Sequence, residues 1–259
     1  MFRNILIFSL FSSVYAWTRV ADERMPGELR VANEGLSHDD NYWYLTNKHF
    51  IYQVDKQPMK IIQSNHYAIP SELTEQGYDH IGDIEVNNGV LYGGVEGGPT
   101  GIIGCWNTTT LEMINYIKIT EQKGMPWVTV NPNTNLLYTS EWSNTERIHI
   151  YDTANNCAYM GYLIIANPEE YPKEVQGASF YNNELYISTN INDGIYKIDI
   201  NSGISEFVFN DDNNYLPDEY YYEMEGLTFW DLSNDGLGLM HMYGNFMNAR
   251  EKAVHNFDL

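Results

Sequence analysis

A short pattern returns five times along this chain, at intervals of about 47 residues. Each copy contains an apolar strand that a Gly usually opens, a strand with an apolar-aromatic pair, and a strand that ends in Asp or Asn. The opening positions are Gly35, Gly82, Val128, Gly177 and Gly226, and the closing segments are residues 51–55, 103–107, 148–152, 195–199 and 254–258. Repeats of about 40–50 residues built from short strands are typical of β-propellers. The sequence therefore predicts an all-β fold, a five-bladed β-propeller of four-stranded blades.

The fourth repeat shows how each blade is built. Its four runs of β-branched and aromatic residues are separated by turns rich in Asn, Asp, Ser and Gly, at residues 182–183, 192–194 and 201–203. Such residues favour the tight turns of an antiparallel meander. The fifth repeat ends after its third strand, so we expect residues 17–29, which precede the first repeat, to supply its fourth strand. Pairing of the two chain ends would close the ring and leave no open edge between the first and last blades.

Residues 1–16 have the pattern of a cleaved signal peptide. Arg3 supplies the charged start, residues 5–11 form a short apolar core, and small residues precede the cleavage point. The apolar core is shorter than the roughly 20 residues that span a membrane, and no later segment approaches that length. We therefore expect one propeller domain over residues 17–259, in a secreted, extracellular protein without membrane insertion.

Three further residues bear on an extracellular location. Asn107 opens the single N-glycosylation sequon, Asn-Thr-Thr, which indicates a glycoprotein. The chain has two cysteines, Cys105 and Cys157, and an even pair in an oxidising compartment is often a disulfide. The two belong to neighbouring repeats, so their separation depends on how the outer strands spread, and the sequence leaves the bonded and free states open. Two cysteines this far apart do not have the spacing of a zinc site.

The chain is strongly acidic. It carries 35 Asp and Glu against 14 Lys and Arg, which gives a formal net charge of −21. This charge repels nucleic acid and anionic membranes and favours cations or basic partners, although acidity can also serve solubility alone. The acidic residues gather in segments that a propeller places on one face: residues 70–81, 120–127, 166–176 and 210–225. We therefore expect a monomer whose acidic face binds a cation, a basic peptide or a small amine-bearing ligand.

Carboxylate and amide side chains are also expected around the central channel. Glu34 and Glu225 each precede an opening Gly directly, and they would be neighbours in a closed ring. Asn190 ends a second strand, at the same face. Calcium takes about six to eight oxygen ligands, and carboxylates that face one another without a cation repel. The sequence therefore predicts a calcium site held by Glu34, Asn190 and Glu225, with protonation or a polar network as the alternatives.

Two tripeptides, Glu34-Gly35-Leu36 and Glu225-Gly226-Leu227, resemble the metal-ligand turn of regucalcin/gluconolactonase-like propellers. In that family a Glu-Gly turn supplies one calcium ligand, Asn and Asp residues of other blades supply the rest, and calcium polarises a lactone or ester. The resemblance implies a calcium-dependent hydrolase or lyase in which Asp83 joins the ligands. The spacing of the Gly-opened strands is also similar to that of plant-type glutaminyl cyclases, which are secreted five-bladed propellers. Residues 175–177 are the nearest match to the opening motif of those enzymes.

A few side chains could carry chemistry or binding. His80 is the candidate general base, since imidazole titrates near neutral pH and Asp79 or Asp83 could orient it, and the alternative is a structural loop histidine. Two tryptophans bracket the upper face of the third blade and could stack on a ligand or pack in the core. The expected ligand-binding residues are Trp127, Glu141 and Trp142. The leading hypothesis is a ligand-binding propeller, with an enzyme of either family above as the alternative.

Overall fold

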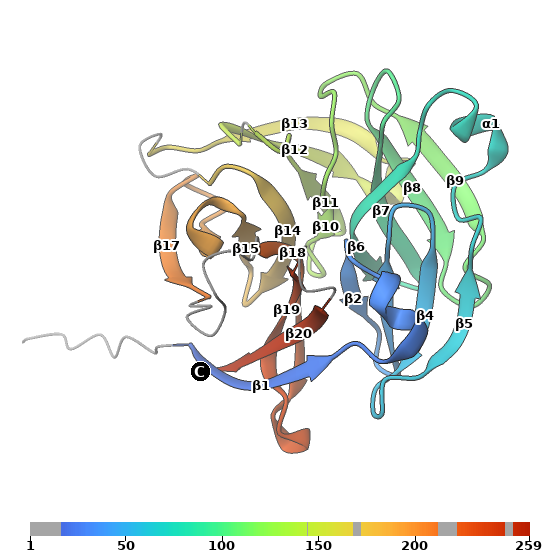
Figure 1. Ribbon diagram of the computed structural model, residues 1–259. Helices are drawn as coiled ribbons and strands as arrows, with labels where there is room; N and C mark the ends of the chain where they lie inside the picture. Colours follow the sequence, from blue (N-terminus) through green and yellow to red (C-terminus); the bar gives the residue numbers. More distant parts are fainter. Residues whose placement is uncertain (1–16, 144, 168–171, 212–221, 247–250) are drawn as a thin grey trace, which may run out of the picture.

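The protein is a five-bladed β-propeller, as the repeats predict (Figure 1). The computed structural model describes most of the chain, namely residues 17–143, 145–167, 172–211, 222–246 and 251–259. Its strands form five four-stranded antiparallel sheets that stand around a common centre. The expected signal peptide lies outside the described residues, as do parts of the expected acidic face. Among the residues that are described, no helix is long and apolar enough to cross a membrane.

Four of the blades are consecutive meanders. Blade 1 contains β2 (Leu36–His38), β3 (Tyr42–Thr46), β4 (Ile51–Asp55) and β5 (Ile61–Asn65). Blade 2 contains β6 (His80–Asn87), β7 (Val90–Glu96), β8 (Ile102–Asn107) and β9 (Met113–Lys118). Blade 3 contains β10 (Thr129–Val130), β11 (Leu136–Thr139), β12 (Arg147–Asp152) and β13 (Ala158–Ile164). Blade 4 contains β14 (Val175–Tyr181), β15 (Glu184–Thr189), β16 (Gly194–Ile198) and β17 (Ser205–Asn210).

Blade 5 joins the two ends of the chain. It contains β18 (Tyr222–Leu232), β19 (Gly238–Phe246), β20 (Glu251–Asp258) and, as its outer strand, β1 (Thr18–Arg24). Strand β1 runs antiparallel to β20, from Thr18 opposite Asp258 to Arg24 opposite Ala253. The prediction that the N-terminal segment completes the last blade is therefore confirmed. The short helical elements are α1 (Ser71–Thr74), η1 (Gly27–Val31), η2 (Thr153–Asn155), η3 (Ile191–Asp193) and η4 (Ser233–Asp235).

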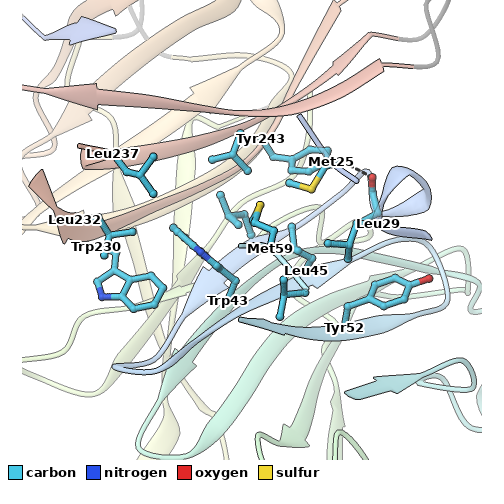
Figure 2. Close-up of a cluster of buried hydrophobic side chains, with 14 residues drawn as sticks. Met25, Leu29, Trp43, Leu45, Tyr52, Met59, Trp230, Leu232, Leu237 and Tyr243 are labelled. Carbon is cyan, nitrogen blue, oxygen red and sulfur yellow. Dashed lines mark hydrogen bonds between the residues drawn. The ribbon is translucent and has the colours of Figure 1, made fainter. Parts of the chain in front are cut away.

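The segment after β1 packs against side chains of both blade 5 and blade 1 (Figure 2). Met25 and Leu29 are only 2% and 1% exposed, and they pack in one apolar cluster with side chains of both blades. Trp43 of blade 1 and Trp230 of blade 5 meet edge to face in this cluster, with ring centroids 4.6 Å apart. Burial of these side chains stabilises the ring closure in addition to the backbone hydrogen bonds between β1 and β20.

The recurring Asp or Asn at the end of each third strand has a local structural role. The Asn107 side chain accepts the backbone N–H groups of Thr109 and Thr110 at 2.8 and 3.0 Å. Asp152 and Asp199 likewise accept the N–H group two residues further along, at 3.0 and 2.8 Å. These Asx turns reverse the chain into the outer strand, which explains why the residue type repeats.

The opening glycines lie where neighbouring inner strands approach most closely. A Cβ atom on Gly82 would collide with the carbonyl oxygen of Pro126, and one on Gly177 would collide with that of Glu225. Only a residue without a side chain lets the inner strands converge on the channel in this way. The same convergence brings polar side chains from different blades together at the channel mouth.

Candidate functional site

One mouth of the central channel holds a pocket of about 220 Å³. Its walls come from β6, from the segments that lead into other inner strands, from the end of β7 and from the segment after β11. The lining residues are Glu34, His80, Gly82, Asp83, Glu96, Pro126, Trp142, Gln176 and Glu225. We call this the upper pocket. Five of the residues that the sequence singled out are therefore brought together here: Glu34, His80, Asp83, Trp142 and Glu225.

His80 and Glu34 form a pair across the joint between blades 1 and 2. The His80 Nε2 and Glu34 Oε2 atoms lie 3.1 Å apart, and the Asn33 amide donates to Glu34 Oε1 at 2.8 Å. Burial alone would lower the His80 pKa, but the hydrogen bond and negative charge of Glu34, together with the charge of Glu96, raise it above its ordinary value. The partner of His80 is thus Glu34, rather than Asp79 or Asp83 as the sequence suggested.

Two more carboxylates share the upper pocket. Glu225 is 4% exposed and enters from blade 5, and the backbone N–H of Gly226 donates to the Glu34 carbonyl at 2.8 Å, which ties blades 5 and 1 together at this point. Glu96 comes from the end of β7 and accepts the Met125 N–H at 2.6 Å. Burial raises the Glu96 pKa, while protonated His80 nearby opposes that shift. The pocket is therefore a small, acidic space with one imidazole.

Asp83 lies at the floor of the upper pocket and has a different environment. Its carboxylate accepts the N–H groups of Leu36 at 3.0 Å, Ala178 at 3.1 Å and Leu227 at 3.4 Å. These donors belong to the inner strands of three other blades, so one side chain crosslinks the centre of the ring. Asp83 is 1% exposed, and burial raises its pKa well above the ordinary value. Its oxygens are occupied by backbone donors, which makes it a structural support for the pocket.

Another buried carboxylate, Glu85, lies two residues after Asp83 on β6 and lines a pocket separate from the upper pocket. Glu85 accepts hydrogen bonds from three inner-strand hydroxyl groups: Ser37 at 3.1 Å, Thr129 at 2.8 Å and Ser179 at 3.5 Å. Burial raises the pKa of Glu85 to about 7, although these hydrogen bonds act against the shift. The donors come from blades 1, 3 and 4, so Glu85, like Asp83, holds several blades together.

The sequence did not reveal this role of Glu85, although two of its hydroxyl donors share a sequence pattern. Ser37, Ser179 and Thr228 each lie two residues after an opening Gly. Glu85 lies three residues after Gly82, and an irregularity in the β6–β7 pairing between Ile81 and Ile84 accommodates the extra residue. A Gly-x-Ser/Thr pattern in the inner strands could therefore have pointed to Ser37 and Ser179 as donors to Glu85.

The remaining predicted residues lie at different distances from the pocket. Trp142 lines the pocket and is 40% exposed, whereas Trp127 is fully buried in an apolar cluster and its indole N–H donates to Ser140 at 3.1 Å. Glu141 accepts the Lys123 N–H at 3.0 Å, outside the pocket lining. Asn190 accepts the Met224 N–H at 2.9 Å and also lies outside the lining. Of the two tryptophans, only Trp142 presents a ring to a ligand in the pocket.

The described residues include no group of three or more His, Cys, Asp or Glu side chains that could hold a metal ion. Glu34 already accepts hydrogen bonds from His80 and Asn33, and Asp83 accepts three backbone N–H groups. Calcium requires about six to eight oxygen ligands, so the carboxylates of the upper pocket do not by themselves form a calcium cage. Calcium binding through Glu34, Asn190 and Glu225 stays a prediction.

Comparison with known proteins supports the fold. The sequence matches no family model, and no curated protein matches it. The structure is similar to that of the glutaminyl cyclase of Myxococcus xanthus, with a TM-score of 0.66 and 10% sequence identity over 94% of this chain and 97% of that one. It is also similar to a luciferin-regenerating enzyme, with a TM-score of 0.60 and 11% identity over 92% of this chain and 95% of the other. Both are β-propellers, so the expected likeness to glutaminyl cyclases holds at the level of the fold.

Proposed function

We propose that the upper pocket binds a small ligand that carries a protonated amine. The observation that carries the proposal is the convergence of Glu34, Glu96 and Glu225 on one small pocket, in which Glu34 pairs with His80. Buried carboxylates favour a cation that can donate several hydrogen bonds, because such a ligand offsets both their charge and their lost hydration. An ammonium group has this chemistry.

The dimensions of the pocket restrict the rest of the ligand. Its volume of about 220 Å³ lies below the roughly 300 Å³ of pockets that hold drug-sized molecules, so a small molecule or one end of a peptide fits. Trp142 is half-exposed at the rim and offers a flat apolar surface to a ring or alkyl chain. We therefore expect an amine with an attached apolar group, such as an aromatic amine or a peptide N-terminus.

Isothermal titration with benzylamine tests this proposal, with benzyl alcohol as the neutral control. Glu225→Gln removes one pocket carboxylate and should weaken benzylamine binding about 10- to 100-fold, since hydrogen bonds to charged groups contribute roughly 1.5–3 kcal/mol. Glu112→Gln, at an exposed turn of blade 2, is the matched control and should leave binding unchanged. Equal binding of amine and alcohol, or equal affinity of wild type and Glu225→Gln, would refute the proposal.

An enzymatic role is the second candidate, and the His80–Glu34 pair favours it. Cyclisation of an N-terminal glutaminyl residue, the reaction that the name of one similar structure indicates, requires its amine to lose a proton and the leaving nitrogen to gain one. An imidazole whose pKa is raised by a neighbouring carboxylate can accept one proton and donate another. Mass spectrometry of a glutaminyl dipeptide incubated with wild type and with His80→Gln tests this role. Loss of ammonia from the dipeptide with the wild type only would support an enzymatic role. No loss with either protein would contradict that role and would leave amine binding as the function of the pocket.

The calcium and secretion hypotheses have separate tests. Melting temperatures in excess EDTA and in millimolar calcium report on a metal bound to the native state, which a hundredfold excess over Kd stabilises by about 2.7 kcal/mol. A rise that Glu225→Gln abolishes would support calcium, and identical melting temperatures would exclude it under these conditions. N-terminal sequencing of the protein from the culture medium of expressing cells would test cleavage after residue 16 and secretion.

A further inference from the structure

The two cysteines meet at the joint between blades 2 and 3. Cys105 belongs to β8 and Cys157 lies between η2 and β13, and their side chains are 5% and 4% exposed. Both pack in the same apolar cluster, in which their thiols are hydrogen-bonded to each other. Both thiols are free in the structure. Contact of two thiols across a joint is the arrangement from which a disulfide between the blades can form.

The backbones on either side are already held together at this point. The Asn115 amide of blade 2 donates to the Asn156 side chain at 2.8 Å, one residue before Cys157. The Tyr92 hydroxyl of blade 2 is hydrogen-bonded to the Thr153 side chain of blade 3. The first contact lies beside both cysteines, because Asn115 is paired with Cys105 in blade 2 and Asn156 precedes Cys157. The two cysteines are thus held close together by contacts that do not involve sulfur.

The conformation of Cys157 is also unusual. Its φ angle is +51°, and that of Asn156 is +50°, so two successive residues have left-handed backbone conformations. Asn adopts this conformation readily, but for a residue such as Cys it is uncommon. The turn that places the Cys157 thiol against blade 2 is thus maintained at some cost in backbone energy, as is common where a residue has a specific role.

We propose that Cys105 and Cys157 form a redox-sensitive pair that closes into a disulfide between blades 2 and 3 when an oxidised thiol compound such as glutathione disulfide reacts with it. The Cys157 thiolate attacks one sulfur of glutathione disulfide, which forms a mixed disulfide and releases one glutathione thiolate. The Cys105 sulfur then gives up its proton and attacks the Cys157 sulfur, which releases the second glutathione. Two protein thiols are oxidised, and one disulfide is reduced to two thiols.

The order of the two attacks follows from the environment of the thiols. The hydrogen bond between them lowers the pKa of Cys157 and raises that of Cys105, so Cys157 is the first to ionise. Because both sulfurs are buried, we expect slow exchange in the native protein and faster closure while the two blades assemble during folding. Once formed, the bond would join blades 2 and 3 covalently. The pairing of β1 with β20 joins the two ends of the chain within blade 5 and does not link blades 2 and 3.

Thiol counting on the full chain tests the proposal, because the protein has only two cysteines. The wild type, refolded in oxidised and reduced glutathione, is alkylated without reduction and digested for mass spectrometry. We expect a crosslinked peptide pair containing Cys105 and Cys157 and no free thiol. Two free thiols, a stable mixed disulfide with glutathione or a crosslinked dimer would each overturn the proposal.

A melting experiment adds a second readout. Oxidised wild type should melt roughly 5–10 °C above the same protein after reduction, the range expected for a disulfide in a chain of this size. Cys105→Ser and Cys157→Ser should each melt at the same temperature with and without reductant. A reductant-dependent shift of similar size in either variant would show that the effect does not come from this pair.

Discussion

Replacement of Glu85 by Gln gives a quantitative test of how the channel is held together. Burial raises the Glu85 pKa from 4.5 to about 7, so the native state binds a proton more tightly there than the unfolded state does. Between these two pH values the unfolded chain releases its proton first, and stability falls as the pH rises. The shift corresponds to about 3 kcal/mol at 1.36 kcal/mol per pKa unit. Gln has nearly the same shape and no charge, so Glu85→Gln should lack this fall.

Urea unfolding of the wild type and Glu85→Gln, at intervals from pH 4.5 to pH 8, measures the effect. The difference in unfolding free energy between the two proteins should change by about 3 kcal/mol over this range in favour of the variant, because groups that do not interact with Glu85 contribute equally to both proteins. Glu112→Gln, at an exposed turn, should give a curve parallel to that of the wild type. Parallel curves for the wild type and Glu85→Gln would refute the assignment of Glu85 as a buried, protonatable support.

Three further predictions concern the ring and the upper pocket. Met25→Ala should lower the free energy of unfolding in urea by about 2–4 kcal/mol, because Met25 is buried at the ring closure. Val20→Ala should lower it by less than about 0.5 kcal/mol, because Val20 is 46% exposed. Equal losses would contradict the packing role of this segment. His80 should titrate above its ordinary pKa of 6.5 by NMR, and Glu34→Gln should lower that pKa; an unchanged value would remove Glu34 as its partner. Asp83→Asn should lower the free energy of unfolding by about 3 kcal/mol or more, since the NH2 group of Asn would face backbone N–H donors. A variant as stable as the wild type would contradict the role of Asp83 in linking the inner strands.

The sequence was sufficient for the architecture because each blade is encoded by local signals. Asx turns at Asn107, Asp152 and Asp199 mark the ends of third strands, and each depends only on residues within three positions. Gly82 and Gly177 mark points where inner strands approach closely. Closure through β1 followed from counting strands in the last repeat. Such features recur with the period, so they can be found without knowledge of distant contacts.

The chemistry of the upper pocket was harder to derive because it depends on pairing between blades. Sequence neighbours suggested Asp79 or Asp83 as the partner of His80, but Glu34, which is 46 residues away, makes the contact. Asp83 points to the channel axis and is occupied by backbone donors from three other blades. Trp127 and Trp142 bracket the upper face of the third blade, yet only Trp142 reaches the pocket. A repeat pattern shows which residues are equivalent and does not show the direction of each side chain.

A crystal structure with bound 4-bromobenzylamine is the most direct test of the proposal that the upper pocket binds protonated amines. The anomalous signal of bromine locates the ring, and the electron density locates the amine nitrogen independently of any assumption about the site. We predict the nitrogen within hydrogen-bond distance of Glu34 or Glu225 and the ring against Trp142. A ligand bound reproducibly elsewhere, with the upper pocket filled only by water, would contradict amine binding in this pocket.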